Sequence, residues 1–217
     1  MNAIKINLPS WQMDAFEPLV SSETMYVHVH KLHKGYVDKL NKRFLSKKIL
    51  NIPPSVVLND LKGYLDEKDQ DFYRNMMGGN VTHTLFWKIL NPKPNHKYKS
   101  KLLSDFGISK KEFINEIINE GMTQFGSGWV WVCIDQGGRL KIYSTKNHDT
   151  PYMRGYQPLI CVDLWEHAYF LDQYGDRKKW LENITQFLDF EMIDKIYTYR
   201  GDLIDQFVLN RTDFTTT

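Results

Sequence analysis

Asp163-Leu164-Trp165-Glu166-His167-Ala168-Tyr169 follows the apolar run Leu159–Val162, which predicts a short buried strand. We expect the chain to continue as a helix from Trp165 to Tyr174. On a helix, residues four apart share one face, so Asp163 and His167 could reach one metal ion. An aspartate and a histidine at this spacing more often lie together on the protein surface than at a metal site. Its position at a strand end, among aromatic residues, favours a functional site.

His28 and His83 are two further candidate metal ligands, and each lies in a helical pattern of the N-terminal half. Taken alone, each could equally be a hydrogen-bonded histidine between helices. Three imidazoles and one carboxylate, without a thiolate, would suit iron or manganese better than a metal that prefers soft ligands.

Apolar spacings of three and four predict a long amphipathic helix that begins near Ser21 and includes Phe44. A second helical region is expected from about Leu58 through Leu90, with Gly78-Gly79 as a weak point. Asn91-Pro92 then marks the clearest boundary in the chain. Further helices are expected at Ser109–Met122, Trp180–Phe187 and Glu191–Tyr199.

The second half also contains strand signals. Trp129–Ile134 is an apolar run, and Asp135-Gln136-Gly137-Gly138 is a hairpin turn signal before Leu140–Tyr143. Together with the strand before Asp163, these segments predict a small antiparallel sheet of about three strands. The fold class is therefore α+β, with an all-helical first half.

Bulk properties are those of an ordinary soluble globular protein: 42% of the residues are hydrophobic, 25% are charged, and the net charge is +2. We expect no nucleic-acid partner, and we interpret the basic run Lys93–Lys101 as a solvated loop. No apolar stretch is long enough for a membrane helix, and Met1–Pro9 lacks a secretory pattern. Cys133 and Cys161 lie in apolar runs, which favours buried free thiols over a disulfide. A cytoplasmic protein is expected.

The stretch from Asp163 to Tyr169 matches the iron/manganese superoxide dismutase signature D-x-W-E-H-A-Y at every fixed position. Three other segments resemble that family in the same order along the chain: the two helices that carry His28 and His83, and the strand Gly126-Ser127-Gly128-Trp129-Val130-Trp131. The resemblance implies an N-terminal helical hairpin domain at residues 1–91 and a C-terminal α/β domain at 92–217, with the metal between them.

The resemblance further implies the disproportionation of superoxide to dioxygen and hydrogen peroxide at one iron or manganese ion per subunit. The implied ligands are His28, His83, Asp163 and His167. A homodimer is expected, with a tetramer left open. The competing hypotheses are a non-catalytic metal-binding or interaction protein on the same fold, and a metal-dependent hydrolase, for which the aromatic wall offers no general base.

The resemblance also implies roles for residues at matching positions outside the ligand set. Tyr36 would be the phenol at the gateway to the metal, and Trp129 and Trp165 would line an apolar wall or belong to the core. Glu166 would reach the partner subunit's His167. Arg177 would correspond to the family's arginine near the entrance.

Two positions depart from the family pattern. The glutamine that usually bonds the metal's solvent is missing, because Gly79 and His148 occupy the two places from which it comes. We expect His148 to take its role, and both iron and manganese stay open. The histidine–tyrosine pair that usually crosses the dimer is replaced by Leu32 and Phe170, which are expected to pack across it as an apolar contact.

Overall fold

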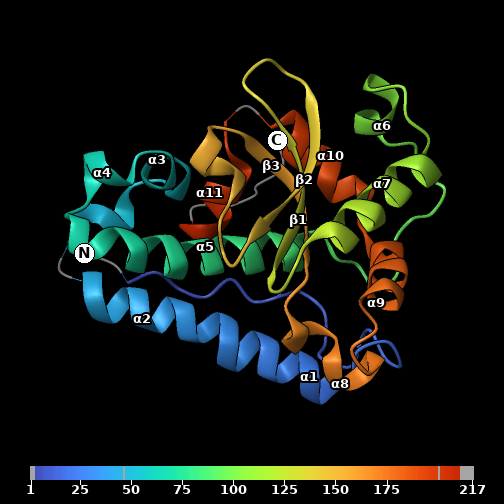
Figure 1. Cartoon of the computed structure of the whole chain (residues 1–217), viewed down its shortest axis with the longest axis horizontal. Helices are drawn as coiled ribbons and strands as arrows, with labels where there is room; N and C mark the ends of the chain where they lie inside the picture. The colour runs from blue at the N-terminus through green and yellow to red at the C-terminus, as the bar shows by residue number, and fades with distance from the viewer. Residues whose placement is uncertain (1–2, 46, 200, 211–217) are drawn as a thin grey trace.

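The computed structural model describes residues 3–45, 47–199 and 201–210, and within them no helix is long and apolar enough to cross a membrane. One long helix is built from three consecutive parts, α1 (Ser22–Val27), the π-helical turn η1 (His28–His33) and α2 (Lys34–Phe44). It runs antiparallel to α5 (Glu67–Ile89), and the two lie side by side (Figure 1). The predicted long helix is therefore present, with an unexpected π-helical turn inside it.

The predicted helical region from Leu58 to Leu90 was wrong in its first part. The backbones of Asp60 and Leu65 are not helical, and these residues separate α3 (Pro54–Asn59) and α4 (Leu61–Tyr64) from each other and from α5. A short 3-10 turn, η2 (Lys48–Asn51), precedes them. By contrast, Gly78-Gly79 does not interrupt α5, since both residues lie inside its 23 residues.

Three strands form the sheet of the second half, in the order β2-β1-β3 with both pairs antiparallel. They are β1 (Gly128–Ile134), β2 (Leu140–Lys146) and β3 (Gln157–Asp163). In the register of β1 with β3, Trp129 lies opposite Asp163. The prediction of an α+β fold with a helical first half and a three-stranded antiparallel sheet is confirmed. The division at residues 91 and 92 stays a prediction.

Helices pack around the sheet. One of them, α7, begins at a capping box: the Ser109 side chain accepts from the backbone N–H of Glu112, and the Glu112 side chain accepts from that of Ser109. The sequence predicts this cap at Ser109. The remaining elements are α6 (Lys101–Asp105), α7 (Lys110–Thr123), η3 (Pro151–Arg154), η4 (Glu166–Ala168), α8 (Phe170–Gln173), α9 (Arg177–Ile184), η5 (Thr185–Phe187), α10 (Phe190–Thr198) and α11 (Leu203–Val208). The sequence pattern did not indicate α11. The frayed tail expected at residues 215–217 lies outside the described residues.

The expected helix from Trp165 to Tyr174 is wrong in form. It is split into the 3-10 turn η4 and the four-residue helix α8, with Tyr169 at φ −146° between them. Asp163 is the last residue of β3, so the Asp163–His167 pair does not share a helix face. A strand end and a tight turn bring the two side chains together instead.

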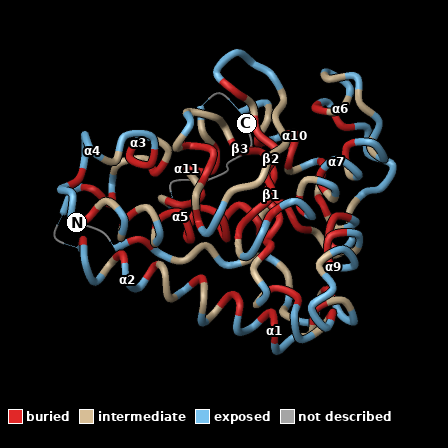
Figure 2. The backbone as a smooth tube through the Cα atoms, viewed as in Figure 1, coloured by how far each residue is buried: buried red, intermediate tan, exposed pale blue. Residues whose placement is uncertain are grey.

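The core is deepest where α5 passes between α2 and the sheet. Every residue from Met77 to Trp87 is buried, and so are the first six residues of β1 (Figure 2). A helix covered on both sides reads as apolar all round, which explains why α5 lacks a clear polar face in its second half. This position brings His83 to the middle of the molecule.

Candidate metal centre

Four elements supply one side chain each to a single cluster. His28 begins η1, His83 lies in α5, Asp163 ends β3 and His167 lies in η4. One donor atom of each lies within 4.8 Å of all the others. His28, His83 and Asp163 are buried, and the His167 side chain is 23% exposed. The structure thus brings together all four residues that the sequence proposed as ligands.

The donor atoms of this cluster face one another. Oδ2 of Asp163 lies 3.2 Å from Nε2 of His28, 3.4 Å from Nε2 of His167 and 3.9 Å from Nε2 of His83. All four atoms are buried and have no hydrogen-bond partner in the part of the chain that the structure describes. Buried polar atoms are nearly always paired, so four that converge without partners fit a cation. Three nitrogens and one carboxylate oxygen suit iron or manganese.

Hydrogen bonds behind the cluster orient two of the donor atoms. Nδ1 of His83 donates to the carbonyl of Gly79 at 2.6 Å, which leaves Nε2 free to bind a metal. Oδ1 of Asp163 accepts from the backbone N–H of Trp165 at 2.8 Å, so Oδ2 points into the cluster. The indole of Trp180 donates to the carbonyl of Asp163 at 2.8 Å. Sequence reasoning placed Trp180 only in a helix, because no local signal links it to residue 163.

The cluster holds the protonation states that metal binding requires. Burial lowers the pKa of His28 to about 4, even though Asp163 acts in the opposite direction. Burial by itself raises the pKa of Asp163, but the adjacent His167 and His28 outweigh it and bring that pKa well below its ordinary value. At neutral pH His28 is therefore a neutral imidazole and Asp163 an anionic carboxylate, the forms that coordinate a cation.

Tyr36 and His148 lie beside the cluster, and Nε2 of His148 is 2.7 Å from Oη of Tyr36. The indole N–H of Trp129 donates to Nδ1 of His148 at 3.3 Å. An indole can only donate, so Nδ1 is the acceptor and the neutral ring carries its proton on Nε2. Burial lowers the pKa of His148 to about 4, so the ring is neutral at pH 7. His148 therefore donates to Tyr36. The ring also stacks on Trp165 at 4.7 Å.

Gly78 and Gly79 make room for these two residues on α5. A Cβ on Gly78 would lie 2.1 Å from the backbone carbonyl oxygen of His148, and one on Gly79 would lie 2.9 Å from the Tyr36 ring. Both contacts are too close for any other residue type. The bare backbone of α5 thus admits His148 and Tyr36, and the glycine pair serves packing rather than flexibility.

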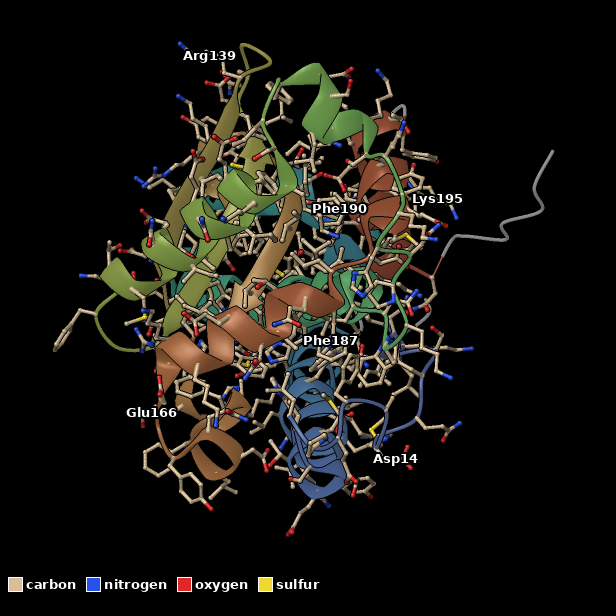
Figure 3. The ribbon with its side chains drawn as sticks, turned by 90° about the vertical axis from the view of Figure 1, so that its right-hand side faces the viewer. Asp14, Arg139, Glu166, Phe187, Phe190 and Lys195 are labelled. Carbon is tan, nitrogen blue, oxygen red and sulfur yellow. The ribbon has the colours of Figure 1, made fainter. Side chains whose placement is uncertain are left out.

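The residues expected at a subunit interface lie at the surface near the cluster. Glu166 and Phe170 are exposed, Leu32 is half-buried, and Figure 3 shows Glu166 at the edge of the molecule. Within the described residues, His167 makes no hydrogen bond through Nδ1. Within the described part of its own chain, the Glu166 carboxylate therefore makes no hydrogen bond to His167.

Arg177 is tied into the protein by several hydrogen bonds, and the role expected of it near the entrance stays a prediction. Its guanidinium donates to the carbonyls of Gln124, Gly126 and Leu164 and to Oη of Tyr169. These bonds fasten the loop before β1 to the end of β3. Arg177 is thus a structural clamp in this chain.

Comparisons with known proteins agree with this geometry. Residues 6–91 match the model of the iron/manganese superoxide dismutase alpha-hairpin domain, and residues 94–196 match that of the family's C-terminal domain. The chain belongs to the iron/manganese superoxide dismutase family. The two matches cover the helical hairpin and the sheet, and each contains two of the four clustered residues.

Relatives from this family align over most of the chain. "Superoxide dismutase [Mn/Fe] 2" of Staphylococcus aureus is 34% identical over 197 residues, which is 88% of this chain and 95% of the relative. "Superoxide dismutase [Mn]" of Thermus thermophilus is 32% identical over 189 residues, which is 85% of this chain and 92% of the relative. The family resemblance seen in the four motifs is therefore confirmed over most of the chain.

Proposed function

We propose that the protein is a superoxide dismutase with one iron or manganese ion held by His28, His83, Asp163 and His167. The observation that carries this proposal is the convergence of four buried donor atoms without hydrogen-bond partners. The reaction consumes two superoxide anions and two protons and yields dioxygen and hydrogen peroxide. The bound metal would supply the one-electron chemistry by alternating between the +3 and +2 states.

The protein's own part is to deliver protons while it keeps bulk water out. Burial raises the pKa of Tyr36 to about 12, so its hydroxyl keeps its proton at neutral pH. Because Nε2–H of His148 already donates to the Tyr36 oxygen, the hydroxyl hydrogen of Tyr36 is free to point elsewhere. We assign this pair to proton delivery at the cluster. Trp165, which stacks on the His148 ring, and Trp129, whose indole N–H donates to its Nδ1, support that role by holding the ring in place.

The proposal extends to a homodimer in which Glu166 accepts a hydrogen bond from the partner subunit's His167. It is supported by the exposed carboxylate of Glu166 and by Nδ1 of His167, which has no partner among the described residues. Large apolar side chains are exposed on α8, at its C-cap and on the loop clamped by Arg177: Phe125 (95%), Phe170 (51%), Leu171 (74%) and Tyr174 (91%). Exposed apolar patches of this kind mark interaction sites. Superoxide is the proposed substrate. A cytoplasmic location is supported by two free, buried cysteines.

The function is tested by loading the protein with manganese or iron, measuring the metal content, and assaying superoxide decay per metal ion. A dismutase would bind one ion per chain and accelerate the decay in proportion to its metal. Stoichiometric binding without acceleration would favour a non-catalytic metal-binding protein on the same fold. Acceleration without bound metal would refute the proposed centre.

The dimer is tested separately by sedimentation at micromolar concentration. A dimer is expected for the wild type, and Glu166→Ala should weaken association and speed metal loss. Glu182→Ala, an exposed glutamate on α9, is the matched control and should change neither. A stable and active wild-type monomer would refute the dimer, and an unchanged Glu166→Ala dimer would refute the bridge alone.

A further inference from the structure

The π-helical turn η1 places two histidines on the same side of the long helix. In an α-helix, five residues rotate a side chain by about 140° beyond a full turn, so His28 and His33 would point in different directions. A π-helical turn holds more residues than an α-helical turn, so it narrows the angle between the directions of side chains five apart. Both rings are accordingly buried, and their centroids lie 5.0 Å and 5.3 Å from the ring of His83.

His33 uses both ring nitrogens on residues of α5. The indole N–H of Trp87 donates to Nδ1 at 3.0 Å, and Nε2 lies 2.9 Å from Oδ1 of Asn80. Because the indole only donates, Nδ1 is the acceptor and Nε2–H donates to Asn80. Asn80, His83 and Trp87 are spaced by three and four residues, so they share one face of α5. His33 therefore binds the same helix face that carries a candidate ligand.

Trp87 links His33 to the candidate metal ligands. Its ring lies 4.8 Å from the ring of His28 and 5.9 Å from that of His83. The indole is held by its bond to His33 and cannot turn without breaking it. His33 also lies nearly parallel to His83, at an interplanar angle of 19°. One side chain thus contacts one candidate ligand directly and another through Trp87.

We propose that His33 is a positioning residue for the metal centre: it locks the π-helical turn against α5 and thereby directs His28 and His83 toward the ion. Lone π-helical turns are rare, so tertiary contacts must hold this one. The Trp87–His33–Asn80 bonds supply such contacts. This inference rests on the proposed metal site.

The test compares variants during manganese loading, with manganese(II) as the only metal. His33→Leu keeps an apolar filling but leaves Trp87 and Asn80 unpaired. Partners that orient ligands typically contribute about 10- to 100-fold to metal affinity. We therefore expect the variant to release manganese to a chelator at least about tenfold faster, with a shifted visible spectrum of the oxidised metal. His33→Gln, which keeps an acceptor and a donor, should lie closer to the wild type.

His30→Gln is the matched control, because His30 lies in the same turn and, within the described residues, its ring packs on the Tyr26 ring and not on a candidate ligand. It should release manganese at the wild-type rate. Nitrogen-15 spectra of the metal-free wild type should show His33 protonated on Nε2 and not on Nδ1. If His33→Leu does not fold, Trp87→Phe, which removes the donor, should give the same faster release.

Three outcomes would overturn the proposal. Wild-type release and spectrum in His33→Leu, with only a lower melting temperature of the metal-free protein, would make His33 a packing residue. An Nδ1-protonated ring would contradict the bonding pattern. A wild type that binds neither manganese nor iron would reject the metal site itself, which distinguishes the failure of the proposed function from the failure of this inference.

Discussion

Asp163 places one carboxylate oxygen among three imidazole nitrogens, while its other oxygen accepts the N–H of Trp165. Asp163→Asn removes the negative charge with little change in shape. We expect metal affinity to fall more than about 100-fold, beyond the range typical of residues that only orient ligands, and activity to fall with it. The measurement is metal content after dialysis together with superoxide decay.

Asp135→Asn is the matched control for this change. Asp135 is also a buried aspartate, but its carboxylate binds Gly137 and Arg139 in the β1–β2 turn. The variant should lose some stability and retain its metal. An Asp163→Asn protein with stoichiometric metal and full activity would contradict the ligand assignment.

His148 is predicted to affect turnover more than metal binding, because it donates to Tyr36 and does not belong to the donor cluster. His148→Ala should keep the metal and lower turnover by about tenfold or more, a part of the roughly 10²- to 10⁴-fold that positioned proton donors contribute. Its pH profile should change as well. His148→Gln should restore part of the rate and alter the ratio of iron to manganese activity. Full turnover in His148→Ala would exclude the proposed role.

At the scale of elements, α5 depends on close contact with the segment that carries His148. Gly78→Ala would set a Cβ against the backbone carbonyl of that residue, and a backbone atom cannot move aside easily. We expect a loss of about 1–3 kcal/mol in the free energy of unfolding, as for other overpacked sites. Urea denaturation of the metal-free protein measures it.

Gly35→Ala in α2 is the matched control, because nothing lies within 4 Å of the added Cβ. In a helix interior, alanine is favoured over glycine by about 0.5–1 kcal/mol, so this variant should be more stable than the wild type. If both alanine variants had the same stability, close packing of α5 would not be the reason for Gly78.

At the scale of the whole molecule, buried histidines predict how stability depends on pH. Burial lowers the pKa of His28, His33 and His148 from 6.5 to about 4. Between these values the unfolded chain takes up protons that the folded chain does not. Stability is therefore complete above about pH 6.5 and falls as the pH drops toward 4. Urea denaturation of the metal-free protein from about pH 7.5 to 4.5 measures this change.

Removing one of these histidines should weaken the pH dependence. His148→Gln should lower the proton uptake on unfolding by about one proton at the acid end of this window. Stability that stays constant from about pH 7 to 5 in the wild type would contradict the burial of these groups as neutral rings.

Much of the architecture was predictable because it depends on local pattern. The apolar periodicity indicated the long helices, and the Ser109 cap marked where α7 begins. The boundaries that failed lie at Asp60–Asp66 and at Tyr169, where side-chain capping and tight turns interrupt segments of helical composition. Such interruptions depend on cap and turn geometry and not on the helix propensity of the residues, so propensity alone did not indicate them.

By itself, the sequence determined the candidate ligands, the fold class and the family, because each is encoded in short motifs whose residue types and order are local information. The tertiary structure alone decided how those residues act together. The four candidate ligands come from four elements, and the π-helical turn sets His28 and His33 both against the ring of His83. Trp129 sets which nitrogen of His148 carries the proton. These features arise from contacts between residues far apart in the chain, and no periodicity or spacing along the sequence records such contacts.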